Sequence, residues 1–68
     1  MDQLLLVEDD LPTRRWLEEV IASAGDPVLA YACGTVQEAL AWLRSGQRTD
    51  LVLTDLRLPK AEFHPDAL

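Results

Sequence analysis

The chain has 68 residues and a formal net charge of −6, with 49% apolar and 26% charged residues. This apolar content is typical of a globular chain and excludes a disordered one, and the acidic balance argues against nucleic-acid binding through this segment. The single cysteine, Cys33, excludes an internal disulfide and fits a reducing compartment. Since no apolar run is long enough for a signal peptide or a membrane span, we expect a cytoplasmic protein without a membrane partner.

The first two predicted elements are a strand and a helix. The apolar run Gln3–Val7 is typical of a strand buried on both faces. Asp10 then fits the N-cap of a helix with Pro12 in its first turn. The helix is predicted to end at Ala24, before Gly25. Its apolar positions recur at helical spacing: Trp16, Leu17, Val20, Ile21 and Ala24.

The next segment predicts a second strand over residues 28–32, less apolar and compatible with an edge position, followed by a turn at Cys33 and Gly34. Thr35 and Glu38 have the spacing of a capping box that opens a second helix. This helix is predicted to end at residue 44. Its apolar stripe comprises four residues: Val36, Ala39, Leu40 and Leu43.

A third apolar run, residues 51–54, predicts a further buried strand. The element order is therefore β-α-β-α-β. Right-handed crossovers between successive strands require a parallel sheet, so we expect an α/β fold.

Acidic side chains follow two of the three predicted strands. Glu8, Asp9 and Asp10 come directly after the first strand, and Asp55 comes directly after the third. Because parallel strands end at the same edge of the sheet, where open α/β sheets bind ligands, we expect these carboxylates to converge. A divalent cation would relieve their repulsion, which indicates a magnesium-dependent phosphate site. For Asp10 we favour the role of a helix cap. For the other carboxylates the alternative to a metal and phosphate site is simply a polar end of the strand.

This pattern resembles the first half of a response-regulator receiver domain, the phospho-acceptor module of two-component signalling, over about residues 3–59. In that family an acidic pair follows the first strand, as Glu8 and Asp9 do, and the phosphorylated aspartate ends the third strand, as Asp55 does in the sequence Leu-Thr-Asp-Leu-Arg-Leu-Pro. The family sheet has the strand order 2-1-3-4-5. The resemblance therefore implies the order 2-1-3 for the strands of this chain.

The resemblance also implies a function. Asp55 would accept a phosphoryl group from a histidine kinase or phosphotransfer protein, which makes the chain a signalling domain with at most self-catalysed phosphorylation and not an enzyme. Mg²⁺ would be bound by Asp9 directly, by Glu8 largely through water, by Asp55 and by the backbone carbonyl of Arg57. Phosphoryl transfer depends mostly on positioning and charge stabilisation, which agrees with such a donor set.

Two departures from the family stand beside this resemblance. A full receiver has about twice this length, and its later strands supply a Lys and a Ser or Thr that contact the phosphoryl group. Lys60 lies too close to Asp55 in sequence to replace that lysine. We therefore divide the chain into a receiver half, residues 1–59, and an irregular tail unlike the family, residues 60–68.

The alternative function is a structural element that is not phosphorylated. In a full receiver the third strand lies inside the sheet, whereas here its outer edge would lack a neighbour and expose apolar side chains. Exposed edges invite pairing with another chain. We therefore expect a homo-oligomer in which third strands pair antiparallel about a two-fold axis.

Overall fold

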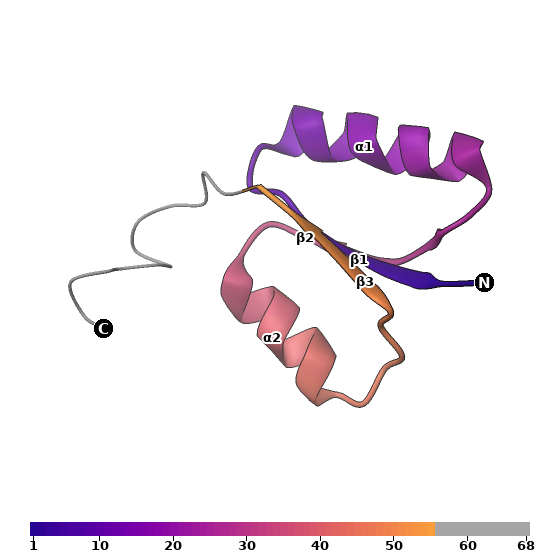
Figure 1. Ribbon diagram of the computed structural model, residues 1–68. Coiled ribbons are helices and arrows are strands. Elements are labelled where there is room, and N and C mark those ends of the chain that lie inside the picture. Colours follow the sequence, from indigo (N-terminus) through magenta and orange to yellow (C-terminus); the bar gives the residue numbers. More distant parts are fainter. Residues whose placement is uncertain (56–68) are drawn as a thin grey trace.

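The computed structural model, which describes residues 1–55, has three strands alternating with two helices (Figure 1). The elements in chain order are β1 (Gln3–Val7), α1 (Leu11–Ala24), β2 (Val28–Cys33), α2 (Val36–Arg44) and β3 (Leu51–Thr54). All strands pair parallel in the order β2-β1-β3. The predicted α/β class, βαβαβ order and 2-1-3 sheet are thereby confirmed. Arg57, Lys60 and the expected tail lie outside the described residues.

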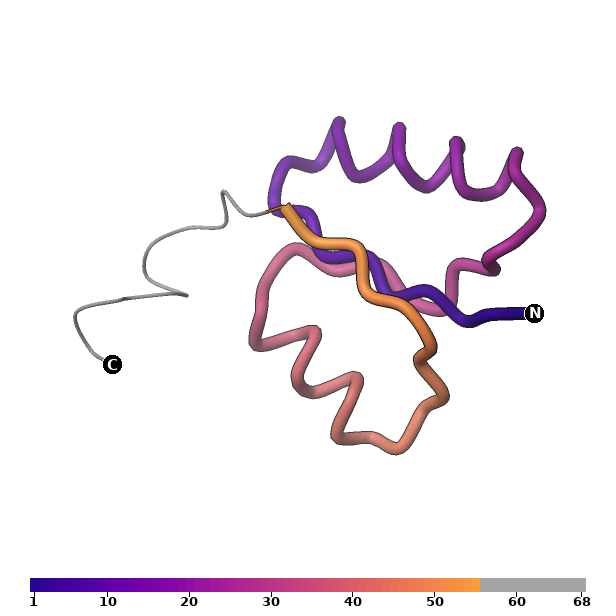
Figure 2. The backbone as a smooth tube through the Cα atoms, viewed as in Figure 1, coloured from indigo at the N-terminus to yellow at the C-terminus, as the bar shows by residue number. Residues whose placement is uncertain are grey.

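The sheet separates two layers of core, because alternate residues of β1 point to opposite faces. Figures 1 and 2 show α1 and α2 on opposite sides of the sheet. The core on the α1 face is formed by three buried residues: Leu4, Leu6 and Ile21. The core on the α2 face is formed by four: Leu5, Val7, Cys33 and Ala39. The central strand β1 is thus covered on both faces, as its continuous apolar sequence predicts.

The predicted helix boundaries are confirmed by their capping contacts. The side chain of Asp10 accepts a hydrogen bond from the Thr13 N–H at the start of α1. Gly25, at φ 82°, ends that helix in the left-handed conformation that favours glycine. At α2 the Thr35 hydroxyl accepts from the Glu38 N–H and donates to the Glu38 carboxylate, both at 3.1 Å. The capping residues of both helices therefore form the short-range hydrogen bonds that the sequence predicts.

Cys33 is placed differently from the prediction. It is the last residue of β2 and pairs with Val7, so the strand extends one residue beyond its expected end, into the expected turn. Its Sγ lies 3.6 Å from the carbonyl oxygens of Leu6 and Thr35. Burial raises the pKa of the Cys33 thiol. The residue therefore serves as a small apolar core group that stays protonated at neutral pH.

The predicted apolar stripes are buried only in part. In α1, Ile21 is buried, whereas Trp16 is 61% exposed. In α2, Ala39 is buried, whereas Leu40 is exposed. The prediction of a buried third strand is also wrong, since every residue of β3 is exposed. The reason is that β3 is an edge strand within residues 1–55, and the helices pack mainly over β1 and β2.

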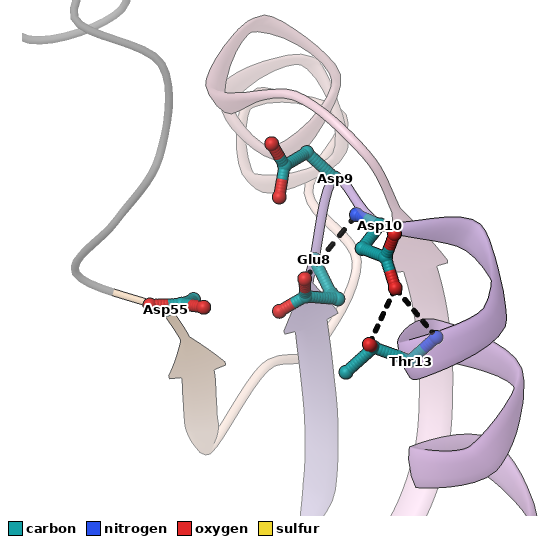
Figure 3. A pocket seen from close by; sticks show the side chains of 5 residues that line it. All are labelled: Glu8, Asp9, Asp10, Thr13 and Asp55. Carbon is teal, nitrogen blue, oxygen red and sulfur yellow. Dashed lines mark hydrogen bonds between the residues drawn. The ribbon is translucent and has the colours of Figure 1, made fainter.

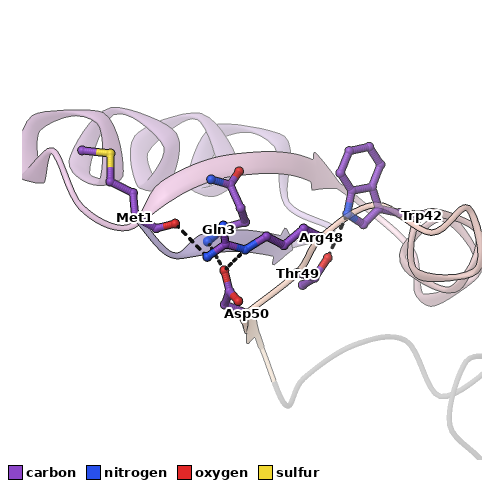
Figure 4. Close-up of polar contacts among 6 residues, drawn as sticks. All are labelled: Met1, Gln3, Trp42, Arg48, Thr49 and Asp50. Carbon is purple, nitrogen blue, oxygen red and sulfur yellow. Dashed lines mark hydrogen bonds and ion pairs between the residues drawn. The ribbon is translucent and has the colours of Figure 1, made fainter.

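The amino-terminal ends of β1 and β3 are joined by polar contacts (Figure 4). The Gln3 N–H donates to the Asp50 carboxylate at 2.7 Å, and the Asp50 N–H donates to the Gln3 carbonyl at 2.8 Å. The hydrogen bond from the Gln3 N–H lowers the pKa of Asp50, and Arg48, 3.1 Å away, acts in the same direction. These contacts fix the start of β3 against the central strand.

Over residues 1–55, neither helix has the length and apolarity needed to cross a bilayer.

Candidate functional site

The carboxyl ends of β1 and β3 form one side of an open cleft of about 380 Å³ (Figure 3). Five residues line it: Glu8, Asp9, Asp10, Thr13 and Asp55. Their convergence follows from the register, because Val7 of β1 pairs with Thr54 of β3 and the next residue of each strand is acidic. The structure therefore brings together all four carboxylates that the sequence indicates.

Glu8 and Asp9 are adjacent in sequence but differ in their surroundings. The Glu8 side chain is only 5% exposed, and its Oε1 accepts a hydrogen bond from the Asp10 N–H at 3.2 Å. Asp9 is exposed. Figure 3 shows the Glu8 carboxylate between those of Asp55 and Asp10. Glu8 is thus held in place by the turn that follows β1, whereas Asp9 faces solvent and can bind a ligand at lower desolvation cost.

Asp10 serves the helix more than the cleft. Its carboxylate accepts hydrogen bonds from both the hydroxyl and the backbone N–H of Thr13. Both bonds lower the pKa of Asp10, and the bond from the hydroxyl has the larger effect. The predicted N-cap is confirmed, and the negative charge lies at the positive end of the α1 dipole.

This lowered pKa predicts a pH dependence of folding stability. A depressed carboxyl pKa stabilises the fold above the ordinary value of 3.8, and this stabilisation is lost as the pH falls through the lowered pKa. In Asp10→Asn the cap is retained without a titrating group. Denaturant unfolding on both sides of pH 3.8 should therefore show a smaller acid-induced loss for Asp10→Asn than for the wild type. Parallel loss in the two proteins would contradict this assignment.

Arg14 supports the acidic turn from the other side. Its Nη1 donates to the Glu8 carbonyl at 3.1 Å. The same atom lies 2.8 Å from the position that a Cβ on Gly34 would occupy, and the Asp9 Cα lies 3.9 Å from it. The Arg14 guanidinium therefore fills the space between the end of β1 and the turn after β2. A side chain at position 34 would displace that guanidinium.

A double-mutant cycle tests this contact. Gly34→Ala should displace the Arg14 guanidinium and remove its hydrogen bond to Glu8, at a cost of about 1 kcal/mol in the free energy of unfolding. In an Arg14→Ala background the added methyl group meets only ordinary van der Waals contacts, the Glu8 carbonyl oxygen at 3.7 Å and the Asp9 Cα at 3.9 Å, so its cost should largely vanish. Urea unfolding of the four proteins measures the difference. Equal costs in both backgrounds would show that Gly34 is needed for another reason.

The donor atoms of the cleft fit Mg²⁺ in kind, because all are oxygens. Within residues 1–55, no three acidic, histidine or cysteine side chains form a ready metal-binding group. Mg²⁺ does not require such a group, since it retains several waters and commonly takes only one or two carboxylates. Asp9 and Asp55, which both line the cleft, are the two carboxylates that would supply such a pair. The Arg57 carbonyl, the fourth expected ligand, lies outside the described residues.

Two residues of this site escaped sequence reasoning. Thr13 lines the cleft and donates hydrogen bonds to Asp10. Its position three residues after the helix cap could have predicted this contact. Arg14 reaches back to the strand end from the first turn of α1. Its role depends on where β2 ends relative to β1, which no local pattern reveals.

No family model matches the chain, and no curated protein or solved structure shows significant similarity to it. Membership of the receiver family therefore stays a prediction from the motifs. A function has to be supported by the chemistry of the cleft.

Proposed function

We propose that the chain is the phospho-acceptor half of a receiver module, in which Asp55 accepts a phosphoryl group from a histidine kinase or phosphotransfer protein. The observation that supports this proposal is the shared cleft. Asp55 at the end of β3 and the acidic turn after β1 line one open depression at the carboxyl edge of a parallel sheet. Ligands of open α/β sheets bind at this edge.

The transfer is a displacement at phosphorus. An Asp55 carboxylate oxygen forms a bond to phosphorus while the bond between phosphorus and the donor imidazole nitrogen breaks, and the imidazole leaves with that electron pair. Mg²⁺ held by Asp9, Asp55 and water would neutralise charge on the transferring oxygens. The protein positions the nucleophile and acts on itself, so it is a signalling domain rather than an enzyme with a separate substrate.

The surroundings of the carboxylates support different roles for them. Asp10 is bound by Thr13 at the helix start, and Glu8 is buried against the Asp10 N–H. Asp55 is half-buried at the end of a strand, a position from which a nucleophile can be both fixed and reached. Asp9 is exposed in the turn that follows β1, where it can serve as a metal ligand.

The proposal is tested with a small phosphodonor, acetyl phosphate, and Mg²⁺. Intact-protein mass spectrometry should show one added phosphate on the wild type and none on Asp55→Asn. Asp10→Asn is the matched control, because it removes a carboxylate from the same cleft while keeping the helix cap, and it should still take up phosphate. No phosphate on the folded wild type, or undiminished uptake by Asp55→Asn, would overturn the proposal.

The second candidate is a structural element that is not phosphorylated. The observation that favours it is the exposure of the apolar strand β3 along its whole length. A folded wild type that takes up no phosphate from acetyl phosphate would select this function.

A further inference from the structure

Exposed apolar side chains of α1 lie on the flank of the helix toward β3. Two contacts fix its orientation: Thr13 lines the acidic cleft beside the end of β3, whereas Arg14 reaches Gly34 beyond the end of β2. Residues three and seven positions after Thr13 share its flank of the helix. These residues are Trp16 and Val20, which are 61% and 45% exposed.

The same holds for α2 on the other face of the sheet. Trp42 stacks on Tyr31 of β2, with ring centroids 4.6 Å apart, and so marks the flank toward β2. Leu40 and Leu43 lie on the other side of the buried Ala39, on the flank toward β3. Both leucines are exposed.

Between these two flanks lies the outer edge of β3, which no other strand within residues 1–55 pairs with. Leu51, Val52 and Leu53 are each at least 43% exposed. Leu51 and Leu53 pair with Leu4 and Leu6, whose side chains lie on the α1 face, so Val52 lies on the α2 face. We call this side of the molecule the β3 side and define it by seven residues: Trp16, Val20, Leu40, Leu43, Leu51, Val52 and Leu53.

We propose that the β3 side binds a second copy of this chain about a two-fold axis normal to the sheet through Val52. A lone peptide strand would cover the edge but neither helix flank, whereas a second copy presents a strand between two helix flanks. The sequence of β3 is self-complementary, since Leu51-Val52-Leu53 reads the same in both directions. The antiparallel copy places Leu51 opposite Leu53 of the second copy, and Val52 opposite its own equivalent.

Like-charge repulsion favours this antiparallel arrangement over a parallel one. In this register Asp50 lies opposite Thr54 of the second copy, and Asp55 lies opposite its Thr49, so no carboxylate lies directly opposite another. A parallel, in-register pairing would set each Asp55 beside its equivalent, and like charges directly opposite are destabilising. This matters for a chain with a net charge of −6. The interface requires no phosphorylation, so it goes beyond the proposed function and holds or fails independently of it.

The experiment is sedimentation equilibrium of the full 68-residue chain at micromolar concentrations. The wild type should have twice the mass of the 7.6 kDa chain. Val52→Lys places two ammonium groups together at the axis and should raise the dissociation constant at least tenfold, about 1.4 kcal/mol. The matched control is Val28→Lys, the same substitution on the opposite edge strand β2, which should leave the dimer intact. Far-UV circular dichroism verifies folding.

A second variant covers the case in which Val52→Lys does not fold. Trp16→Gln changes an exposed side chain on the α1 flank and should also weaken the dimer. Val52→Cys should form an intermolecular disulfide at the axis under mild oxidation, whereas Val28→Cys should not. A monomeric wild type, dissociation by Val28→Lys, or an unaffected dimer in the folded Val52→Lys or Trp16→Gln variant would each overturn the proposal.

Discussion

Leu5→Ala should lower the free energy of unfolding of the chain by a large fraction of its wild-type value. Leu5 has no exposed surface and lies in the middle of β1, the strand that both others pair with. Removing a fully buried leucine side chain costs about 2–5 kcal/mol. A folded chain of this length has a total stability of roughly 3–10 kcal/mol. The substitution therefore removes a large share of the stability, and circular dichroism during urea titration measures it.

The control is Leu53→Ala, the same chemical change in the neighbouring strand. Leu53 is exposed in the single chain, so its truncation should cost far less at low protein concentration. At higher concentration the dimer proposed above would add to its cost, and both variants are therefore compared at one concentration. Similar losses for the two leucines in the dilute chain would contradict the described core.

The elements of the fold were predictable because each depends on residues close in sequence. Asp10 and Thr35 cap the helices through residues three positions later. The run Gln3–Val7 is buried on both faces because its two neighbouring strands are parallel and their crossover helices lie on opposite sides. The edge at which Glu8 and Asp55 meet follows from the same parallel order.

Burial was predicted less well, since it depends on what covers an element. Trp16 and Leu40 occur at helical spacing, which indicates an apolar flank but not the presence of a neighbour beyond it. In a three-strand sheet the helices rest on β1 and β2, and the flanks toward β3 stay uncovered. Val52 is exposed for the same reason. The apolar pattern of this chain therefore exceeds what residues 1–55 bury by themselves.

The roles of neighbouring acids were predictable only in part. The cap at Asp10 depends on local spacing, and the structure confirms it. The surroundings of Glu8 join residues distant in sequence, because its carbonyl accepts from Arg14, whose guanidinium lies against Gly34. Three consecutive carboxylates thus have three environments, and this difference makes a direct test of metal binding possible.

Asp9→Asn should weaken Mg²⁺ binding by about 10- to 100-fold while leaving the free energy of unfolding without Mg²⁺ unchanged. Asp9 is exposed, so its loss disturbs no core contact. Even a unit-charge pair about 4 Å apart gains about 4 kcal/mol at the effective dielectric constant of a protein surface, so the loss of a directly coordinating carboxylate should be readily measurable. Isothermal titration with MgCl₂ gives the affinity, and urea unfolding gives the stability.

Glu8→Gln and Asp10→Asn complete the test, because all three substitutions remove one negative charge within three residues. Glu8→Gln keeps an oxygen that can accept from the Asp10 N–H, and it should weaken Mg²⁺ binding less than Asp9→Asn because Glu8 would act through water. Asp10→Asn should weaken it least, since Asp10 is bound at the helix start. Equal weakening by all three would indicate general attraction between the cation and an acidic surface, and would exclude coordination by Asp9.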